Sequence, residues 1–360
     1  MHDLRFGVVG ASRGLRLAEV CRDLSHVQVV AVYDVDRDRS VTAATTVGAM
    51  AYHAFDSFLD SGVDAVVIAS PIPAHTAQVQ AALAAGKHVL CEVLPCATIA
   101  EAQSLVRAVR ASRAIYMLAE NYCYFGEVEL VRRLHRDGRF GEVYYAESDH
   151  LNDIHELWRG ESGELTWRGR GEVGVYSTHS LGPLLAILDD RVATVTALTV
   201  EGGKFDPDVT QPTMHLMQMT TVGGAAMRLR IDLASPRPPI GAYYALQGTC
   251  GSYESWRGLG DAPKVWLADE HGPSSRRSWA KWHPLADLAP RYLADWAVSV
   301  PGEEGADRRM LADFISAVRG EIAPPFDVYR GLDFTLPGIF ADASAAAGGA
   351  PIAIPDPRDW

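Results

Sequence analysis

The chain has 360 residues, of which 48% are hydrophobic, and it carries a formal net charge of −12 at pH 7. This length suits two domains, since domains commonly hold about 100–200 residues. The acidic balance excludes a nucleic-acid-binding surface, which needs clustered lysine and arginine. No apolar run reaches the about 18 residues of a membrane-spanning helix.

From residue 4 to about residue 122, short apolar runs alternate with helical patterns. After a first strand that begins at Leu4, the expected strands are Val27–Tyr33, Ala65–Ala69, His88–Cys91 and Ile115–Leu118. The expected helices are Leu15–Leu24, Arg37–Val47, His75–Ala85 and Ile99–Arg110. Such alternation predicts a doubly wound parallel sheet with helices on its faces, so residues 1–122 form an α/β domain.

The pattern changes after residue 122. A helix at Val128–Arg136 leads to strand-like runs at Glu142–Asp149, Val192–Val200, Thr213–Thr221, Ala225–Leu233, Ala242–Gly248 and Gly251–Glu254. Several of these runs alternate polar and apolar residues, which is typical of a sheet with one exposed face. Residues 123–360 are therefore expected to form an α+β domain with a largely antiparallel open sheet. A helix at Asp307–Val318 and an Ala/Gly-rich tail follow, and the tail is expected to pack on the first domain.

The first residues, MHDLRFGVVG, lead into a strand without a signal-peptide pattern, which predicts a cytoplasmic protein. The five cysteines are scattered and form no CxxC pair. They are expected to be reduced thiols, and no metal site is predicted.

A degenerate glycine motif, Gly10-Ala11-Ser12-Arg13-Gly14-Leu15, links the first strand to the first helix. In a Rossmann unit, the backbone N–H groups of such a turn face a pyrophosphate, and an acidic residue about 20 positions further on binds the ribose hydroxyls. Asp34 stands at that distance, and its carboxylate favours NAD over NADP, although Arg37 and Arg39 lie close by. The alternative is an ordinary βα turn in another doubly wound sheet.

Ligands of parallel sheets bind beyond the carboxyl ends of the strands. This rule selects residues that follow the later strands as candidates for cofactor binding: Ser70, Pro71, Glu92 and Glu120. His75 is expected to lie near the cofactor at the start of a helix.

The order of these motifs resembles the Gfo/Idh/MocA oxidoreductases, named for glucose-fructose oxidoreductase and inositol dehydrogenase. The resemblance rests on LRFGVVGASRG, VYDVDRDR, VDAVVIASPIPAH, GKHVLCEVLPCAT and the β-rich second half, and it covers nearly the whole chain. It implies an N-terminal domain that holds NAD or NADP. It also implies a C-terminal domain whose open sheet carries the substrate face and often an oligomer interface.

Within that family, the chain is most similar to the NAD-dependent glycoside hydrolases typified by α-N-acetylgalactosaminidases. The stretches that carry this likeness are CEV at 91–93, ENYCY at 120–124, FGE at 140–142, ELTWR at 164–168, YSTHSLGP at 176–183 and SPRP at 235–238. In that subgroup, NAD⁺ oxidises a ring hydroxyl to a ketone, the glycosidic substituent leaves by elimination, water adds, and the hydride returns. The resemblance implies the same cycle here.

The departures concern proton handling. Ordinary dehydrogenases of the family carry a lysine where this chain has Val93, and aspartates where it has Val175 and Gly182. The glycosidase-like subgroup also lacks that lysine, and its Tyr-x-x-His is matched by Tyr176 and His179. It has a tyrosine and a histidine where this chain has His150 and Asn152.

Oxidation of an alcohol needs a base near its hydroxyl. His179 is the first candidate, with Tyr176 one helical turn away and His150 following the strand at Glu142–Asp149. Asp153, Trp167 and Arg168 are candidates for contact with a sugar. The alternatives are a structural histidine that caps a helix for His179, a solvated loop for His150 and Asp153, and ordinary loop packing for Trp167 and Arg168.

The sequence therefore predicts an NAD-dependent enzyme that abstracts a hydride from a sugar or glycoside, as the first step of redox-neutral cleavage. A plain NAD(P)-dependent sugar dehydrogenase and an NAD-binding regulatory protein are the alternatives. The expected partners are a small carbohydrate and further copies of the chain, as a homodimer or homotetramer formed through the C-terminal sheet, with neither nucleic acid nor membrane.

Overall fold

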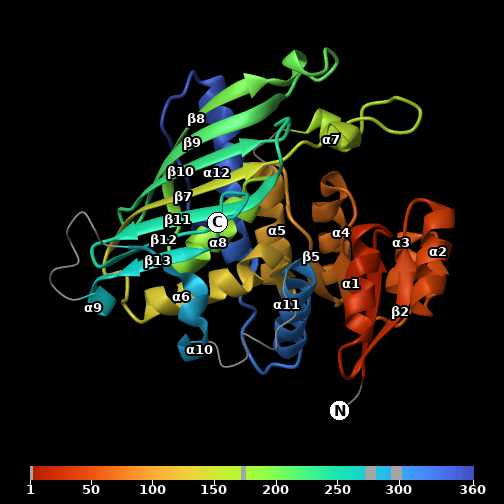
Figure 1. The fold of residues 1–360 in the computed structure, drawn as a ribbon. Helices are drawn as coiled ribbons and strands as arrows, with labels where there is room; N and C mark the ends of the chain where they lie inside the picture. The colour runs from red at the N-terminus through yellow and green to blue at the C-terminus, as the bar shows by residue number, and fades with distance from the viewer. Residues whose placement is uncertain (1–2, 172–175, 272–280, 293–301) are drawn as a thin grey trace. The chain divides into compact units, whose positions relative to one another are not determined.

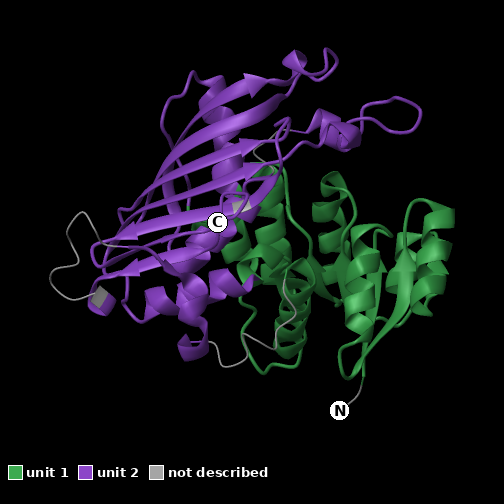
Figure 2. Ribbon diagram, in the orientation of Figure 1, with its two compact units in different colours: residues 1–124, 302–335, 356–360 green, residues 125–301, 336–355 purple. Residues whose placement is uncertain are grey.

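The computed structural model describes residues 3–171, 176–271, 281–292 and 302–360. The chain forms two compact units, which Figure 2 colours separately. Unit 1 contains residues 1–124, 302–335 and 356–360, and unit 2 contains residues 125–301 and 336–355. The sequence-based division at residue 122 lies close to the first boundary, whereas two later segments of the chain also belong to unit 1.

Unit 1 is built around a six-stranded parallel sheet in the order β3-β2-β1-β4-β5-β6. Its strands are β1 (Leu4–Val9), β2 (Val27–Tyr33), β3 (Met50–Tyr52), β4 (Ala65–Ile68), β5 (His88–Cys91) and β6 (Tyr116–Leu118). Its helices are α1 (Arg13–Arg22), α2 (Arg37–Val47), α3 (Phe55–Leu59), α4 (Ile72–Ala84), α5 (Ile99–Ala111), α11 (Gly302–Val318) and the first part of α12 (Val328–Ala346), with short 3-10 turns at η1 (Asn121–Tyr124) and η7 (Pro357–Asp359). This strand order is that of a Rossmann domain, which places a ligand crevice beyond the ends of β1 and β4 (Figure 1).

Local signals explain where these helices begin and end. Asp36 caps α2 by accepting hydrogen bonds from the N–H groups of Asp38 and Arg39, and Gly48 ends the helix in a left-handed conformation. Thr98 and Glu101 form a capping box at the start of α5. Such caps satisfy backbone groups that a helix end leaves unpaired, so these boundaries follow from nearby residues alone.

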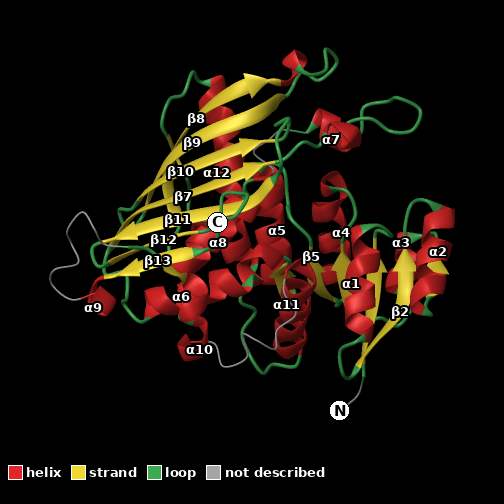
Figure 3. Ribbon diagram, viewed as in Figure 1, coloured by secondary structure: helices red, strands yellow, loops and turns green. Residues whose placement is uncertain are grey.

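Unit 2 is built around a nine-stranded mixed sheet in the order β14-β13-β12-β11-β7-β10-β9-β8-β15 (Figure 3). Its strands are β7 (Val143–Leu151), β8 (Val192–Glu201), β9 (Pro212–Thr221), β10 (Ala226–Asp232), β11 (Ile240–Gly248), β12 (Gly251–Glu254), β13 (Lys264–Leu267), β14 (His283–Pro284) and β15 (Ile352–Ala353). Its helices are α6 (Gly126–Arg136), α7 (Trp167–Arg170), α8 (Thr178–Leu188), α9 (Ala268–His271), α10 (Ala289–Tyr292) and the second part of α12, with 3-10 turns η2 (His155–Leu157), η4 (Gly202–Lys204) and η6 (Leu285–Asp287). The pair β7–β10 is parallel and the other pairs are antiparallel.

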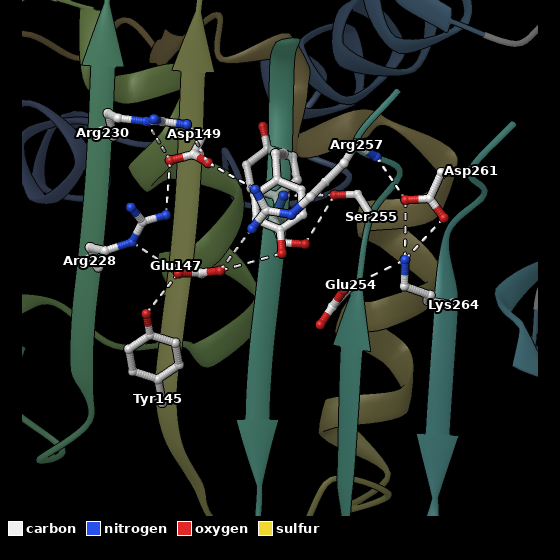
Figure 4. A network of polar contacts seen from close by, with 12 residues as sticks. Tyr145, Glu147, Asp149, Arg228, Arg230, Glu254, Ser255, Arg257, Asp261 and Lys264 are labelled. Atoms are coloured by element: carbon white, nitrogen blue, oxygen red, sulfur yellow. Dashed lines mark hydrogen bonds and ion pairs between the residues drawn. The ribbon is translucent and has the colours of Figure 1, made fainter. Parts of the chain in front are cut away.

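The two faces of this sheet differ in polarity. Helix α8 packs on β7 and β11, and the side chains of β7 that share its face are Ala146, Ser148 and His150. The opposite face of β7 carries Glu147 and Asp149 in a network of arginines and tyrosines, drawn in Figure 4. One face is therefore a core and the other is lined by charges, as the alternating sequence pattern predicts.

The fold class predicted from the sequence is confirmed: a Rossmann-like parallel sheet followed by a mostly antiparallel sheet. Several features differ from the prediction. The strand expected to end at Asp149 continues to Leu151, so His150 lies inside β7 and not on the loop after it. The short elements β3 and α3 were missed, and the Ala/Gly-rich tail contains the long helix α12.

Candidate functional site

The turn after β1 has the backbone geometry of a nucleotide-binding turn. Gly10 has a φ of +93°, and a Cβ at this position would lie 2.5 Å from the carbonyl oxygen of Ala69. Only glycine fits both the dihedral angle and the space. A Cβ at Gly14 would approach Val8 Cγ1 to 2.6 Å, so Gly14 allows the close helix–strand contact that the third glycine of the usual fingerprint provides.

Asp34 is fixed beside this turn. Its Oδ2 accepts a hydrogen bond of 2.8 Å from the backbone N–H of Ala11, and its Oδ1 accepts one of 2.8 Å from Asp36. The carboxylate is half-buried, and each oxygen keeps a second lone pair that can accept from a ribose hydroxyl. Together with Ser12 at the N-cap of α1, the residues Gly10, Gly14 and Asp34 fit the adenosine and pyrophosphate parts of NAD.

The guanidinium of Arg13 is held by two carboxylates. Its Nε donates to Glu92 Oε1 at 2.7 Å, and its two terminal nitrogens donate to Asp307 on α11 at 2.7 and 2.6 Å. Asn121 donates a further hydrogen bond of 3.0 Å to Asp307. The side chain of Arg13 therefore joins the turn, the segment after β5 and α11, whereas its backbone N–H at the start of α1 is the group suited to a phosphate.

The segments after β4 and β5 are joined by His75. This histidine is buried, and its ring nitrogens lie 2.6 Å from the carbonyl oxygen of Ser70 and 2.7 Å from that of Leu94. Burial lowers the pKa of His75, while the two carbonyl groups oppose that shift. Ser70 donates through its hydroxyl to Gln78 at 2.5 Å, and Pro71 directly precedes α4. His75 thus positions the two segments on which Ser70, Pro71 and Glu92 lie.

Glu120 follows β6 and is fully buried. Its Oε1 accepts a hydrogen bond of 3.2 Å from the backbone N–H of Tyr122. Burial raises the pKa of Tyr122, and Glu120 adds to that increase. Glu120 and Glu92 follow the neighbouring strands β6 and β5, so unit 1 presents two carboxylates beyond the carboxyl ends of its sheet.

Unit 2 brings together the three residues that the sequence selected for proton transfer. The rings of His150 on β7 and His179 on α8 have centroids 6.0 Å apart, and those of His150 and Tyr176 are stacked at 6.2 Å. We call His150, Tyr176 and His179 the ring cluster. Tyr244 on β11 donates through its hydroxyl to the carbonyl oxygen of His179 at 2.5 Å, which ties the first turn of α8 to the sheet.

Arg168 adds a positive charge to the ring cluster. Its guanidinium lies 4.2 Å from the centroid of the Trp167 ring. Burial raises the pKa of Tyr176, and Arg168 partly offsets that increase. Trp167 and Arg168 begin the short helix α7, which Thr166 caps by accepting from the N–H groups of Arg168 and Gly169. The short helix therefore fixes both side chains.

Asp153 is placed differently. Its carboxylate is about half exposed and accepts from the backbone N–H of His155 at 3.1 Å, and the two side chains also pair. The His155 side chain lowers the pKa of Asp153 through this hydrogen bond. The described contacts of Asp153 thus belong to a local turn, and its proposed contact with a sugar gains no support from them.

Three residues of these arrangements were not found from the sequence: Gly241, Tyr244 and Asp307. The carbonyl oxygen of Gly241 accepts a hydrogen bond from His150. An isolated glycine in a strand pattern is a signal for a β-bulge. Asp307 offered no local signal. Val93 and Gly182 stand in the segment after β5 and inside α8, respectively, and Val175 lies outside the described residues.

Unit 1 is a Rossmann unit with an anchored carboxylate of the kind that binds a ribose. Unit 2 contains an open mixed sheet, with histidine, tyrosine and arginine on its helix-covered side. Together these features define a two-domain NAD-binding protein of the oxidoreductase type. Comparison with known proteins gives the particular family. Residues 4–120 match the oxidoreductase family with an NAD-binding Rossmann fold (Gfo/Idh/MocA), and residues 208–358 match the C-terminal domain of glycosyl hydrolase 109.

Relatives of known name agree with both matches. The chain is 25% identical to a glycosyl hydrolase family 109 protein of Solibacter usitatus, over 98% of this chain and 88% of the relative. It is 24% identical to an α-N-acetylgalactosaminidase of Tannerella forsythia, over 98% of this chain and 86% of the relative. Levoglucosan dehydrogenase, solved with NADH and L-sorbose, shares the fold with a TM-score of 0.83 at 19% identity, covering 99% of this chain and all of the other.

The chain therefore resembles the Gfo/Idh/MocA oxidoreductases in its N-terminal part and the glycosyl hydrolase 109 proteins over most of its length. The N-terminal match is to an oxidoreductase family with an NAD-binding Rossmann fold, so the chain is an NAD-binding enzyme of the oxidoreductase type. These findings confirm the family and the NAD cofactor predicted from the sequence. Within the part of the chain that the structure describes, no helix is both long and apolar enough to cross a membrane.

Proposed function

We propose that the enzyme cleaves a glycoside in a redox-neutral cycle that begins with hydride abstraction from a ring hydroxyl. The observation that carries this proposal is the ring cluster, in a chain whose residues 208–358 match the C-terminal domain of glycosyl hydrolase 109. Two imidazoles and a phenol within one cluster are the groups that several proton transfers on one sugar require.

In the proposed cycle, Gly10, Ser12, Gly14 and Asp34 hold NAD, which when bound accepts a hydride from an alcohol carbon and returns it later. A histidine of the ring cluster removes the proton of the hydroxyl, and His179 is the first choice from the sequence. The resulting ketone acidifies the adjacent C–H, a second proton transfer allows the glycosidic substituent to leave, and water adds. Trp167 offers an aromatic surface to a sugar ring, and Arg168 offers hydrogen-bond donors to its oxygens.

The test uses a panel of nitrophenyl glycosides in deuterated water with NAD below the substrate concentration. A redox-neutral cycle releases nitrophenol over many turnovers, accumulates no NADH, and leaves deuterium at the carbon beside the oxidised one. Steady formation of NADH without release of nitrophenol would instead establish a plain dehydrogenase.

A catalytically weak regulatory protein is the second candidate, and Val93 and Gly182 favour it because they replace a lysine and an aspartate of ordinary family dehydrogenases. His179→Ala separates the two possibilities. Cleavage that survives this change would remove His179 from catalysis. Binding of NAD without activity on any sugar of the panel would support the regulatory role.

We further propose that the chain forms a homodimer or homotetramer through the charged face of its nine-stranded sheet. Leu198 on that face is 59% exposed, and Arg228 and Arg230, two strands away on β10, are partly exposed. Light scattering of the purified protein, before and after Leu198→Glu, tests this assembly. A cytoplasmic location stays a prediction from the sequence.

A further inference from the structure

The strand β11 contains a bulge directly opposite His150. In the register with β7, Ile240 pairs with Leu151 and Tyr243 pairs with Asp149, so Gly241 and Ala242 together face the single residue His150. A bulge interrupts the ladder of backbone hydrogen bonds and redirects the groups at the extra residue. The carbonyl group of Gly241 is thereby available to a side chain, and it accepts a hydrogen bond of 2.8 Å from His150 Nδ1.

This contact determines the tautomer of His150. A carbonyl oxygen can only accept, so Nδ1 must carry the hydrogen, and in the neutral ring Nε2 then carries the lone pair. The same arrangement, in which a fixed acceptor holds one ring nitrogen and leaves the other as base, operates in catalytic triads. The burial of His150 in β7 and its ring contacts with Tyr176 and His179 place this nitrogen within the ring cluster.

We propose that His150 is the residue that accepts the hydroxyl proton, and that Gly241 is the positioning residue that sets this role. This inference rests on the proposed sugar oxidation and assigns its base to His150 in place of His179. In the oxidation step, the O–H proton goes to His150 Nε2, the C–H electron pair leaves as hydride to NAD⁺, and the C=O bond forms.

A matched pair of variants tests the base. In His150→Asn the amide nitrogen takes the place of Nδ1 and keeps the bond to Gly241, but no group replaces Nε2; in His150→Gln the amide extends to the Nε2 position. We expect single-turnover oxidation of sugar by the NAD-loaded enzyme to fall by about 10²–10⁴-fold in both variants, with NAD affinity unchanged. The acid limb of the pH–rate profile, which reports the base, disappears. His26→Asn, at an exposed site, keeps the rate of the wild-type enzyme.

The tautomer can be measured without activity. In protein labelled with ¹⁵N-histidine, the signals of His150 are identified by their loss in His150→Gln. We expect a protonated Nδ1 and an unprotonated Nε2 in the wild-type protein above its titration. A protonated Nε2 would overturn the proposal even if the variants were unstable.

The remaining outcomes separate this proposal from the proposed function. If His150→Asn keeps the wild-type rate and acid limb while His179→Asn loses them, His179 is the base and sugar oxidation still stands. If the wild-type enzyme binds NAD but oxidises no sugar, both proposals are wrong.

Discussion

The guanidinium of Arg13 and the carboxylate of Asp307 form a bidentate ion pair, with N–O distances of 2.7 and 2.6 Å, between residues 294 positions apart in the chain. Asp307 is buried, and Glu92 on the other side of Arg13 is nearly so. One cation thus forms ion pairs with two carboxylates at the turn that we propose to bind the cofactor.

Removal of this cation should destabilise unit 1 strongly. Arg13→Ala leaves Asp307 and Glu92 without their ion pair, and we expect the free energy of unfolding to fall by about 3–5 kcal/mol. Arg16→Ala, on the same helix, breaks an exposed pair with Glu303 and should cost less than about 1 kcal/mol. Chemical denaturation at pH 7 measures the free energy of unfolding of both variants. Equal losses would show that the ion pairs of Arg13 stabilise the protein no more than an exposed pair does.

Gly10→Ala should abolish NAD binding, because its methyl group would meet the carbonyl oxygen of Ala69 at 2.5 Å. Gly48→Ala is the matched control: its φ is +71°, but nothing lies within 4 Å of the added Cβ. The control carries only the backbone strain of about 1–2 kcal/mol and should bind NAD normally. Fluorescence titration with NADH measures both, and normal binding by Gly10→Ala would show that the turn can shift.

Asp34→Ala should weaken NAD binding by about 10–100-fold, because hydrogen bonds to a charged group contribute about 1.5–3 kcal/mol. NADPH binding should weaken less, since the carboxylate repels its 2′-phosphate. Asp38→Asn, in the first turn of α2, serves as the control for a charge change nearby. Titration with each reduced cofactor gives the ratio, and an equal loss for both cofactors would remove Asp34 from cofactor selection.

Glu127 on α6 makes the stability of unit 2 depend on pH. Burial raises its pKa from 4.5 to about 7, so between these values the folded state holds a proton that the unfolded state has released. The contribution of Glu127 to the free energy of unfolding is therefore greatest below pH 4.5. This contribution decreases by up to about 1.4 kcal/mol per pH unit as pH rises towards 7. Glu127→Gln should remove this slope in denaturation curves, whereas Glu142→Gln, at an exposed position, should keep it.

Asp149 anchors the network of Figure 4. It is fully buried and accepts hydrogen bonds from Arg228, Arg230 and Arg257 at 3.0 to 3.3 Å. Asp149→Asn removes the charge that these partly exposed guanidiniums share, with an expected cost of about 2–3 kcal/mol. Glu254→Gln, at the edge of the network beside Lys264, should cost less than about 1 kcal/mol in the same denaturation assay. A similar cost for both would mean that Asp149 is not the anchor.

The candidate site could be predicted in part, and the successful part is local. Gly10 and Asp34 were found because one helix and one strand separate them at the spacing usual for a Rossmann unit. His150, Tyr176 and His179 were selected by residue type and resemblance, but their grouping depends on the packing of α8 against β7. His150 was expected on a loop, because the apolar pattern of the strand ends at Asp149 and two further residues complete the ladder with β10 and β11.

The sequence by itself determined the alternation of strands and helices, the caps of α2 and α5, and the glycine turn with its carboxylate. These features depend on residues that are close along the chain, whose propensities and hydrogen bonds act before any distant contact forms. The tertiary structure alone decided that Asp307 holds Arg13, that a bulge in β11 presents Gly241 to His150, and that the rings of His150 and His179 meet. Each of these contacts joins segments whose distance is set by the packing of whole elements, and packing leaves no periodic signal in the sequence.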